Sequence, residues 1–203
     1  MTGLRAEGVR TRHVGPCNLA VSAGECVTLS GPSGSGQTLL LRALADLDPH
    51  QGRVWLDDKE QHAMSGPEWR RWVAYLPGES HWWAPQVGDH FEGDVSELLV
   101  AVGFEPACLG WEVSRLSAGE RQRLALVRLL AIRPRALLLD EPTANLDNDN
   151  TLKVEALVTR YLTDHHAPVL WVSHSPQQER RIARRHLRMD QGRLTERTPD
   201  GVD

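Results

Sequence analysis

The sequence predicts an α/β protein with a mostly parallel sheet. Segments with the character of strands alternate along the chain with segments of helical periodicity, an order that favours parallel strands joined by helices. Residues 136–139 form a short, entirely apolar run of the kind found in central parallel strands, and residues 169–173 predict a second buried strand. A glycine-rich loop at residues 31–36 follows a third apolar strand and precedes a helix.

The composition is that of an ordinary globular protein. Apolar residues make up 40% of the 203 residues and charged residues 25%, so we expect a single domain over residues 1–203. The net charge of -4 does not indicate a nucleic-acid partner. The three scattered cysteines predict neither a disulfide framework nor a zinc site, and they favour a reducing cytosol. The sequence shows no signal peptide and no apolar run near ~18 residues, so a membrane role is expected to pass through a partner.

The first part of the chain predicts strands around two helices. Weak alternation predicts edge strands, and a helix from Thr38 is expected to stop before Pro49. The other expected elements are a buried strand at 26–30, a strand and turn at 52–58, a short helix at 67–72 and a strand at 73–77, with the edge strands at 4–9 and 18–21.

The second part predicts a helical insertion and then a return to the sheet. We expect residues 78–120 to form a small helical subdomain inserted into the α/β core, with helical pattern at 95–102. Long helices are predicted from Ser117 through Ile132 and over residues 148–164. A basic helix is predicted at 177–185 and a strand–turn–strand at 186–195. We expect the basic face to be solvated rather than to contact lipid headgroups; it comprises Arg180, Arg181, Arg184 and Arg185.

The glycine-rich loop has every residue of a phosphate-binding P-loop except one. Its glycines let backbone N–H groups turn inward, and the helix that follows adds partial positive charge at its N-terminus. Thr38 is placed to hold Mg²⁺ through its hydroxyl. The pattern requires Lys where Gln37 stands, so the loop taken alone could be only a flexible turn. The loop residues are Gly31, Pro32, Ser33, Gly34, Ser35, Gly36, Gln37 and Thr38.

The strand at 136–139 ends in a pair of carboxylates. Such a strand end can direct Asp140 toward a metal ion, while Glu141 orients or activates an attacking water. The alternative is an ordinary acidic strand terminus. The apolar strand, the following Pro142 and the separation from the P-loop disfavour that alternative.

Residues 116–123, LSAGERQR, are the most specific stretch of the chain. Here, and over nearly its full length, the chain resembles the ATP-binding cassette (ABC) family, whose signature is LSGGQ or LSGGE followed by RQR. The sequence departs from that signature only at Ala118. The Ser117 hydroxyl and the backbone N–H groups at a helix N-terminus, including those of Gly119 and Glu120, can form an anion site. Ser117 and Glu120 can also form a capping box, and both interpretations can hold together.

The resemblance implies further site residues and a fold. Asp147, in the segment 144–147, is similar to the family's D-loop, and His174 is similar to the switch histidine that contacts the γ-phosphate. The implied fold is a P-loop NTPase core of the ABC type with a small antiparallel β part and a short helical subdomain. The implied cofactors are ATP and Mg²⁺, held between the P-loop and Asp140–Glu141 of one copy and the signature of another.

The resemblance also implies partners and a location. Two copies are expected to form a head-to-tail homodimer that drives a separate integral membrane permease from the cytoplasmic face. The closest resemblance is to subunits assigned to iron-export transporters, and haem-export and lipoprotein-release cassettes are near alternatives. Soluble ABC proteins of DNA repair or translation are disfavoured, because the sequence shows no coiled-coil insertion, second cassette or basic groove.

Departures from the family pattern bear on the rate of hydrolysis. Gln37 brings no charge to the phosphates, and Gly78 stands where the family has a Gln that helps to hold Mg²⁺ and the attacking water. Glu79 is a possible substitute for that Gln, and His13 is the nearest candidate for the missing aromatic that stacks on adenine. Two hypotheses therefore stay open: a transport ATPase, or a regulatory cassette with little or no turnover.

Trp82 and Trp83 follow the Gly78 loop, in the region where the resemblance places contact with the permease. Aromatic side chains are enriched in the cores of protein interfaces. Trp82 and Trp83 are equally well suited to packing inside the helical subdomain, so contact with the permease and internal packing both stay open.

Overall fold

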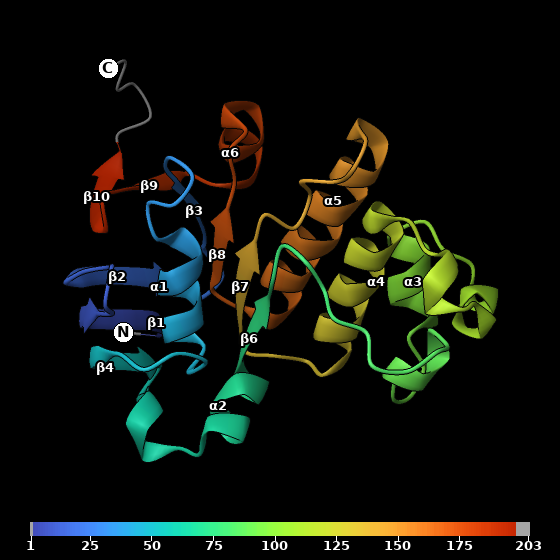
Figure 1. The fold of residues 1–203 in the computed structure, drawn as a ribbon, viewed down its shortest axis with the longest axis horizontal. Coiled ribbons are helices and arrows are strands. Elements are labelled where there is room, and N and C mark those ends of the chain that lie inside the picture. Colours follow the sequence, from blue (N-terminus) through green and yellow to red (C-terminus); the bar gives the residue numbers. More distant parts are fainter. Residues whose placement is uncertain (1, 198–203) are drawn as a thin grey trace.

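The computed structural model describes residues 2–197, whose strands form two sheets. The smaller sheet is antiparallel, with the order β2–β1–β4–β5 (Figure 1). Its strands are β1 (Gly3–Arg10), β2 (Cys17–Ser22), β4 (Gln51–Leu56) and β5 (Lys59–Glu60).

The larger sheet has the order β10–β9–β3–β8–β7–β6. The strands from β9 to β6 run parallel, and only the edge strand β10 is antiparallel to its neighbour. These strands are β3 (Cys26–Ser30), β6 (Val73–Leu76), β7 (Ala136–Asp140), β8 (Val169–Val172), β9 (Arg185–Asp190) and β10 (Arg193–Arg197). The prediction of an α/β fold with a mostly parallel sheet and a small antiparallel part is confirmed.

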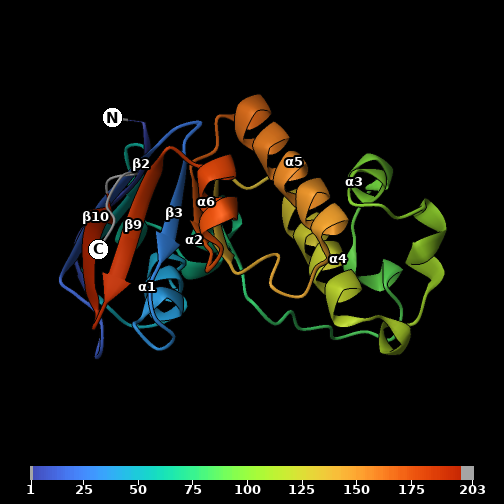
Figure 2. The same cartoon turned by 90° about the horizontal axis from the view of Figure 1, so that it is seen from above.

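Six α-helices accompany the sheets in the described part of the chain. In two perpendicular views α1 lies beside the smaller sheet, while α4 and α5 lie together at the other end of the molecule (Figures 1 and 2). No helix among residues 2–197 combines the length and the apolar character that a bilayer crossing requires. The helices are α1 (Gln37–Leu44), α2 (Gly66–Trp72), α3 (Ser96–Ala101), α4 (Ala118–Ala131), α5 (Asn148–His165) and α6 (Pro176–Ile182).

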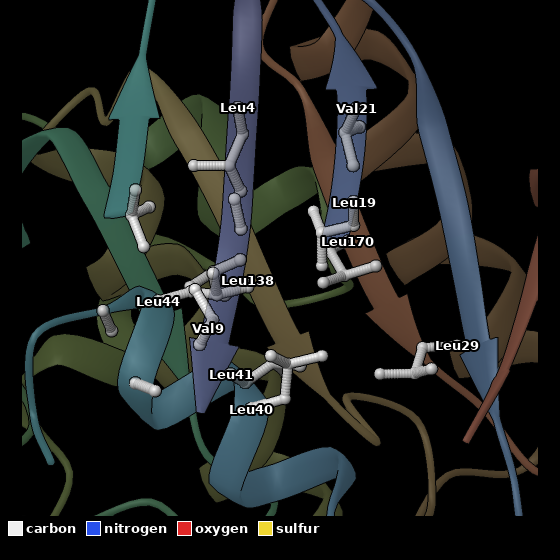
Figure 3. Packing of buried hydrophobic residues seen from close by; sticks show 14 of the residues in the cluster. Leu4, Val9, Leu19, Val21, Leu29, Leu40, Leu41, Leu44, Leu138 and Leu170 are labelled. Atoms are coloured by element: carbon white, nitrogen blue, oxygen red, sulfur yellow. The ribbon is translucent and has the colours of Figure 1, made fainter. Parts of the chain in front are cut away.

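Two apolar cores flank the larger sheet. The first lies between the two sheets and contains Leu40, Leu41 and Leu44 of α1 packed with side chains of β1, β3, β7 and β8 (Figure 3). The second lies on the opposite face of the larger sheet and is filled from α4, α5 and the segment around α3. Burial on both faces explains the continuous apolar runs of β7 and β8, since a strand with one wet face would alternate with polar residues.

The two cores determine where the strand ends point. In β7, Leu138 belongs to the first core, whereas Leu137 and Leu139 belong to the second. Successive side chains of a strand alternate between faces, so Asp140 shares the face of Leu138, toward α1. The same alternation in β6 places Tyr75 on the first-core face.

The segment between β6 and α4 contains one short α-helix and three 3₁₀ turns. The turns are Gly88–His90, Pro106–Gly110 and Val113–Arg115. Its apolar side chains, among them Leu99 and Phe104, pack into the second core with α4 and α5. The grouping of residues 78–120 as a subdomain stays a prediction.

The predicted basic helix over residues 177–185 is wrong at its carboxyl end. Helix α6 stops at Ile182, because the chain must become extended for Arg185 to pair with Val27 in the parallel ladder between β9 and β3. Arg185 then forms ion pairs with Glu25 at 2.9 Å and Glu196 at 3.0 Å. The four arginines therefore do not share one helix face.

We expect Trp69→Phe to destabilise the fold. The Trp69 side chain is fully buried and its Nε1–H donates to the Leu44 carbonyl oxygen at 2.8 Å, which satisfies a carbonyl in the last turn of α1. Losing the bond and part of the ring should lower the free energy of unfolding by about 1–3 kcal/mol, measured by urea denaturation followed by circular dichroism. The control Trp83→Phe, at a side chain 72% exposed, should change it by less than about 0.5 kcal/mol. Equal effects of the two variants would contradict this account of the α1 end.

Candidate functional site

The glycine-rich loop joins the carboxyl end of β3 to the amino end of α1. Gly31 and Gly36 have φ of 154° and 112°. A Cβ atom at Gly31 would lie 2.1 Å from the Met189 carbonyl oxygen, and one at Gly36 would lie 2.4 Å from Val14 Cγ2. Only glycine fits at these two positions. The close approach that the two glycines allow holds the loop over the amino end of α1, where backbone N–H groups can bind phosphate.

Gln37 is buried and bridges the two ends of the loop. Its Nε2 donates to the Gly31 carbonyl oxygen at 3.1 Å, and its Oε1 accepts from Ser35 Oγ at 2.8 Å. The amide therefore braces the loop through neutral hydrogen bonds. Pro32, Ser33 and Gly34 are exposed at the turn of the loop.

Thr38 and Asp140 meet as the sequence predicts, although they are far apart in the chain. Thr38 Oγ1 donates to Asp140 Oδ2 at 2.8 Å. A third residue joins them, because the Tyr75 hydroxyl donates to the same carboxylate oxygen at 2.9 Å. Burial of the tyrosine, and then the nearby Asp140 charge, raise the pKa of Tyr75, so its proton stays in place as a donor to Asp140.

These oxygens suit Mg²⁺. A hydroxyl and a carboxylate converge at one point, directly beside the loop that can bind phosphate. Magnesium ions are often held by one or two protein oxygens together with substrate phosphates and water. Residues 2–197 contain no cluster of three or more His, Cys, Asp or Glu side chains able to hold a metal by themselves.

Glu141 and His174, which were predicted separately as site residues, lie in contact. His174 Nε2 lies 3.0 Å from Glu141 Oε1, and the two side chains are 40–43% exposed. Glu141 has a φ of 47°, in the left-handed region that non-glycine residues rarely adopt. Backbone strain of this kind concentrates at functional sites. The turn redirects the chain directly after Asp140, so that the two neighbouring carboxylates serve different partners.

The LSAGE segment starts α4, and its capping box is present. Ser117 Oγ accepts from the Glu120 backbone N–H at 3.2 Å, and the Glu120 carboxylate accepts from the Ser117 N–H at 2.8 Å. The bond from the Ser117 N–H lowers the pKa of Glu120. A Cβ at Gly119 would lie 2.8 Å from the Asn145 carbonyl oxygen, whereas Ala118 is exposed. The position that departs from the signature is therefore one with room for a methyl group, and the packed position keeps its glycine.

The signature residues and the P-loop do not come together within one chain. Helices α1 and α4 are well separated in both views (Figures 1 and 2). Asp147 lies with the signature, since the Gly119–Asn145 contact joins α4 to the loop that ends at Asp147. Asp147 caps α5 by accepting from the Asn150 N–H at 2.8 Å, and this bond lowers the pKa of the Asp147 carboxyl.

The remaining candidates lie around these groups. A Cβ at Gly78 would have the Asp140 carbonyl oxygen as its nearest neighbour, at 3.6 Å, so a side chain would fit beside the backbone of Asp140. Glu79 is exposed. His13 is also exposed, on the loop whose Val14 packs against Gly36, so it lies in the segment next to the P-loop.

Trp82 and Trp83 have different environments. Trp82 is half-buried and packs against the second core, while Trp83 is 72% exposed. The His90 ring packs edge-on against both indoles, and its Nε2 accepts the backbone N–H groups of Trp83 and Ala84. The Arg128 guanidinium lies 4.7 Å from the centre of each indole ring. Trp82 therefore packs against the protein interior, whereas Trp83 lies at the surface.

Sequence reasoning missed Tyr75 and Gln178. Counting every second residue along the strand from Val73 would have placed Tyr75 on the face of Asp140. Gln178 gives no such signal, because its partners come from distant parts of the chain.

Comparison with known proteins agrees with this geometry. The sequence matches the family described as ABC transporter over residues 14–144, more than half of the chain. The phosphate import ATP-binding protein PstB of Aeropyrum pernix is 34% identical over 202 residues, covering 87% of this chain and 80% of that protein. The aliphatic sulfonates import ATP-binding protein SsuB 2 of Paracoccus denitrificans is 34% identical over 207 residues, covering 98% of this chain and 80% of that protein.

A solved structure shares the fold. It is the dimeric structure of an ATP-binding cassette in a post-hydrolysis state bound to ADP and phosphate, with a TM-score of 0.82 at 22% identity, covering 98% of this chain and all of that one. The assignment rests on the glycine loop, on the Thr38–Asp140 contact and on helix α4 with its LSAGE start. The similarity to the two import proteins agrees with it. The chain belongs to the ABC transporter family.

Proposed function

We propose that the chain is the ATP-binding subunit of an ABC transporter, which binds and hydrolyses Mg-ATP and drives transport by a separate membrane permease. The observation that carries the proposal is the meeting of Thr38 with Asp140 and of Glu141 with His174 beside the glycine loop. A phosphate held by the loop would lie next to a metal position and a carboxylate base, which is the arrangement that phosphoryl transfer to water requires.

Each group has a separate task in this proposal. Backbone N–H groups of residues 31–38 bind the phosphates, and Thr38 and Asp140 hold Mg²⁺, which would neutralise phosphate charge when bound. Glu141 accepts a proton from the attacking water. His174 orients the Glu141 carboxylate through their 3.0 Å contact and can donate to a γ-phosphate oxygen.

A second copy completes the site. Ser117 and Ala118 are exposed at the amino end of α4, a helix well separated from α1 in both views, so in this proposal they meet a nucleotide bound to another subunit. A head-to-tail pair places the amino end of α4 against the nucleotide of its partner. The Ser117 hydroxyl and the N–H groups of Gly119 and Glu120 are available for its phosphates, with Asp147 in the adjoining loop.

The permease is the proposed partner at the Trp83 surface. A groove of about 720 Å³ lies beside the Gly78 loop and is lined by Tyr75, Pro77, Trp83, Phe91 and Arg128. A protein anchored there would be close to the Tyr75–Asp140 contact. The import proteins PstB and SsuB 2 support a transport role, and the proposed location is the cytoplasmic face of the membrane, peripheral through the permease.

The alternative is a regulatory cassette that closes on ATP with little turnover. The neutral brace formed by Gln37 favours it, since the side chain brings no positive charge to the phosphates. The Glu141–His174 pair favours hydrolysis, because a cassette that only binds ATP needs no group to position water. Iron export stays a prediction of the sequence resemblance.

We expect Gln37→Lys to raise both ATP affinity and turnover. A cation about 4 Å from a phosphate charge is worth roughly 4 kcal/mol at an effective dielectric of 20, and part of this is offset by loss of the Ser35 bond. Nucleotide titration and phosphate release measure the two quantities. Gln37→Glu keeps the size of the side chain but introduces a negative charge, so it should weaken ATP binding. A wild type that already turns over at the rate of the Lys variant would contradict our interpretation of position 37.

Glu141→Gln should trap an ATP-bound dimer. The amide keeps the size of the side chain but cannot accept the proton of water, so hydrolysis should fall by about 10²-fold or more while binding persists. Light scattering in Mg-ATP should show twice the monomer mass. The control Glu97→Gln, at an exposed position on α3, should stay monomeric under the same conditions. A Glu141→Gln protein that remains monomeric would count against the dimer mechanism.

Gly78→Gln should be tolerated and should raise turnover. The backbone of Gly78 does not adopt a left-handed φ, and its nearest neighbour leaves ordinary van der Waals space. An amide there could bind Mg²⁺ or the attacking water and add a preorganised contact, for which we expect a gain of about tenfold in kcat. Gly78→Leu is the control for side-chain size. Equal rates in the two variants would show that the amide has no role.

A further inference from the structure

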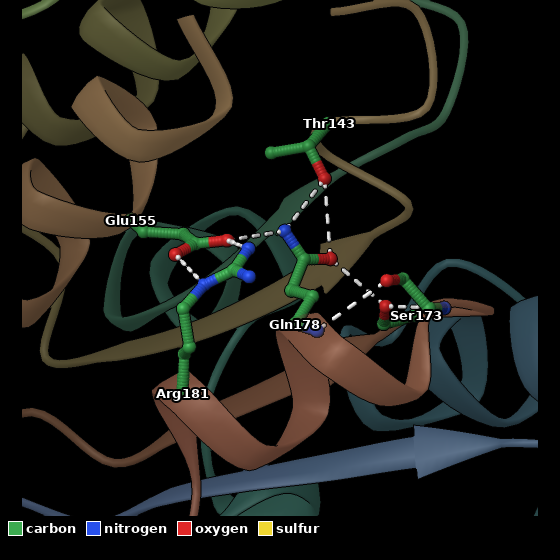
Figure 4. A network of polar contacts seen from close by, with 6 residues as sticks. Thr143, Glu155, Ser173, Gln178 and Arg181 are labelled. Carbon is green, nitrogen blue, oxygen red and sulfur yellow. Dashed lines mark hydrogen bonds and ion pairs between the residues drawn. The ribbon is translucent and has the colours of Figure 1, made fainter. Parts of the chain in front are cut away.

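A buried amide connects the loop that carries Glu141 to the loop that carries His174. Gln178, on α6, is 4% exposed and lies behind the solvent-exposed Glu141–His174 pair. Its Oε1 accepts from Ser173 Oγ at 2.8 Å, and its amide also bonds Thr143 Oγ1, with Nε2 at 3.0 Å (Figure 4). Thr143 is two residues after Glu141, and Ser173 directly precedes His174.

The orientation of this amide is set by an ion pair between the buried Glu155 carboxylate and the exposed Arg181. Gln178 Nε2 donates to Glu155 Oε1 at 2.8 Å, and Arg181 binds both oxygens of that carboxylate at 2.8 and 3.0 Å. A carboxylate accepts only, so the NH₂ end of the amide must face Glu155. The oxygen end is thereby directed at Ser173, whose hydroxyl must be the donor.

Both neighbours of His174 are held through Gln178. Ser173 Oγ accepts from the Ser175 backbone N–H at 3.1 Å while it donates to the amide. Ser175 Oγ in turn accepts from the Gln178 backbone N–H at 3.3 Å, which caps α6. The side-chain hydroxyls on both sides of His174 are therefore bonded to Gln178.

These bonds close a ring around the reacting groups. The ring runs from Glu141 along the chain to Thr143, across the Gln178 amide to Ser173, along the chain to His174, and back to Glu141 through the 3.0 Å contact. We propose that Gln178 is a positioning residue that fixes Glu141 and His174 relative to each other for ATP hydrolysis. This inference rests on the proposed function.

The first test compares two neighbouring glutamines. Gln178→Leu keeps the size of the side chain and removes every hydrogen bond of the side-chain amide. We therefore expect kcat to fall by about tenfold to a hundredfold, the scale expected for a misplaced catalytic group. The nucleotide Kd should stay within about twofold, since the P-loop is untouched. The control Gln177→Leu, at an exposed position on the same helix, should change neither quantity. A Gln178→Leu enzyme with the wild-type kcat overturns the proposal.

A double-mutant cycle separates positioning from general stability. If Gln178 acts through the Glu141–His174 pair, Gln178→Leu should lower kcat by a clearly smaller factor in a His174→Ala background than in the wild type, whereas additive losses overturn the inference. The imidazole NMR resonance of His174, assigned by its absence in His174→Ala, should shift in Gln178→Leu and not in Gln177→Leu. This measurement needs no turnover. An inactive wild type would count against the proposed function, and an unchanged His174 resonance would count against the role of Gln178.

Charge exchange supplies a rescue. Gln178→Glu alone places two carboxylates against each other and should lower kcat at least as much as Gln178→Leu. In the double variant that also carries Glu155→Gln, the carboxylate and the amide have exchanged places between Arg181 and the hydroxyls of Ser173 and Thr143. This variant should return kcat to within about threefold of wild type. Failure of the exchange in a variant that folds as wild type by circular dichroism would overturn the hydrogen-bond assignment. Should Gln178→Leu not fold, Ser173→Ala, which removes one bond of the ring, takes its place in the cycle.

Discussion

Burial of β7 and β8 on both faces is the constraint on which the rest of the structure depends. Each strand contributes alternate side chains to two different cores, so neither strand can shift by one residue without moving polar groups into apolar surroundings. Register then fixes the functional groups at the strand ends. Asp140 continues the Leu138 face toward α1 and meets Thr38, and the left-handed turn at Glu141 sends the next carboxylate toward His174.

Most of the fold and the individual candidate site residues could be predicted from the sequence, because their signals are local. The apolar run of 136–139, the glycine spacing and the LSAGE segment each specify an element and its end without knowledge of distant residues. Thr38 and Asp140 were expected to converge on one Mg²⁺ ion, whereas the contact between Glu141 and His174 became visible only in the structure. The predicted end of the basic helix at residue 185 was wrong, because α6 ends at Ile182. The pairing of Arg185 with β3, rather than helical propensity, decides where this helix stops.

Gln178 was outside the reach of such reasoning for a related reason. A glutamine in a short polar helix is usually solvated, and nothing nearby in the sequence indicates burial. Its partners Thr143, Glu155 and Ser173 come from three other segments, and only the packing of α5 and α6 beyond the larger sheet brings them together. Gln37 shows the opposite case, since its identity was evident at once but its bonds to Gly31 and Ser35 required coordinates.

The close approach of Gly119 to Asn145 has a mechanical consequence. A Cβ atom at Gly119 would lie 2.8 Å from the Asn145 carbonyl oxygen, so the amino end of α4 packs closely against the loop that follows Glu141. Thr143 in that loop bonds the Gln178 amide behind His174. In the proposed head-to-tail dimer, the end of α4 that meets the partner's nucleotide would therefore press directly on the loop that follows the proposed base of its own subunit.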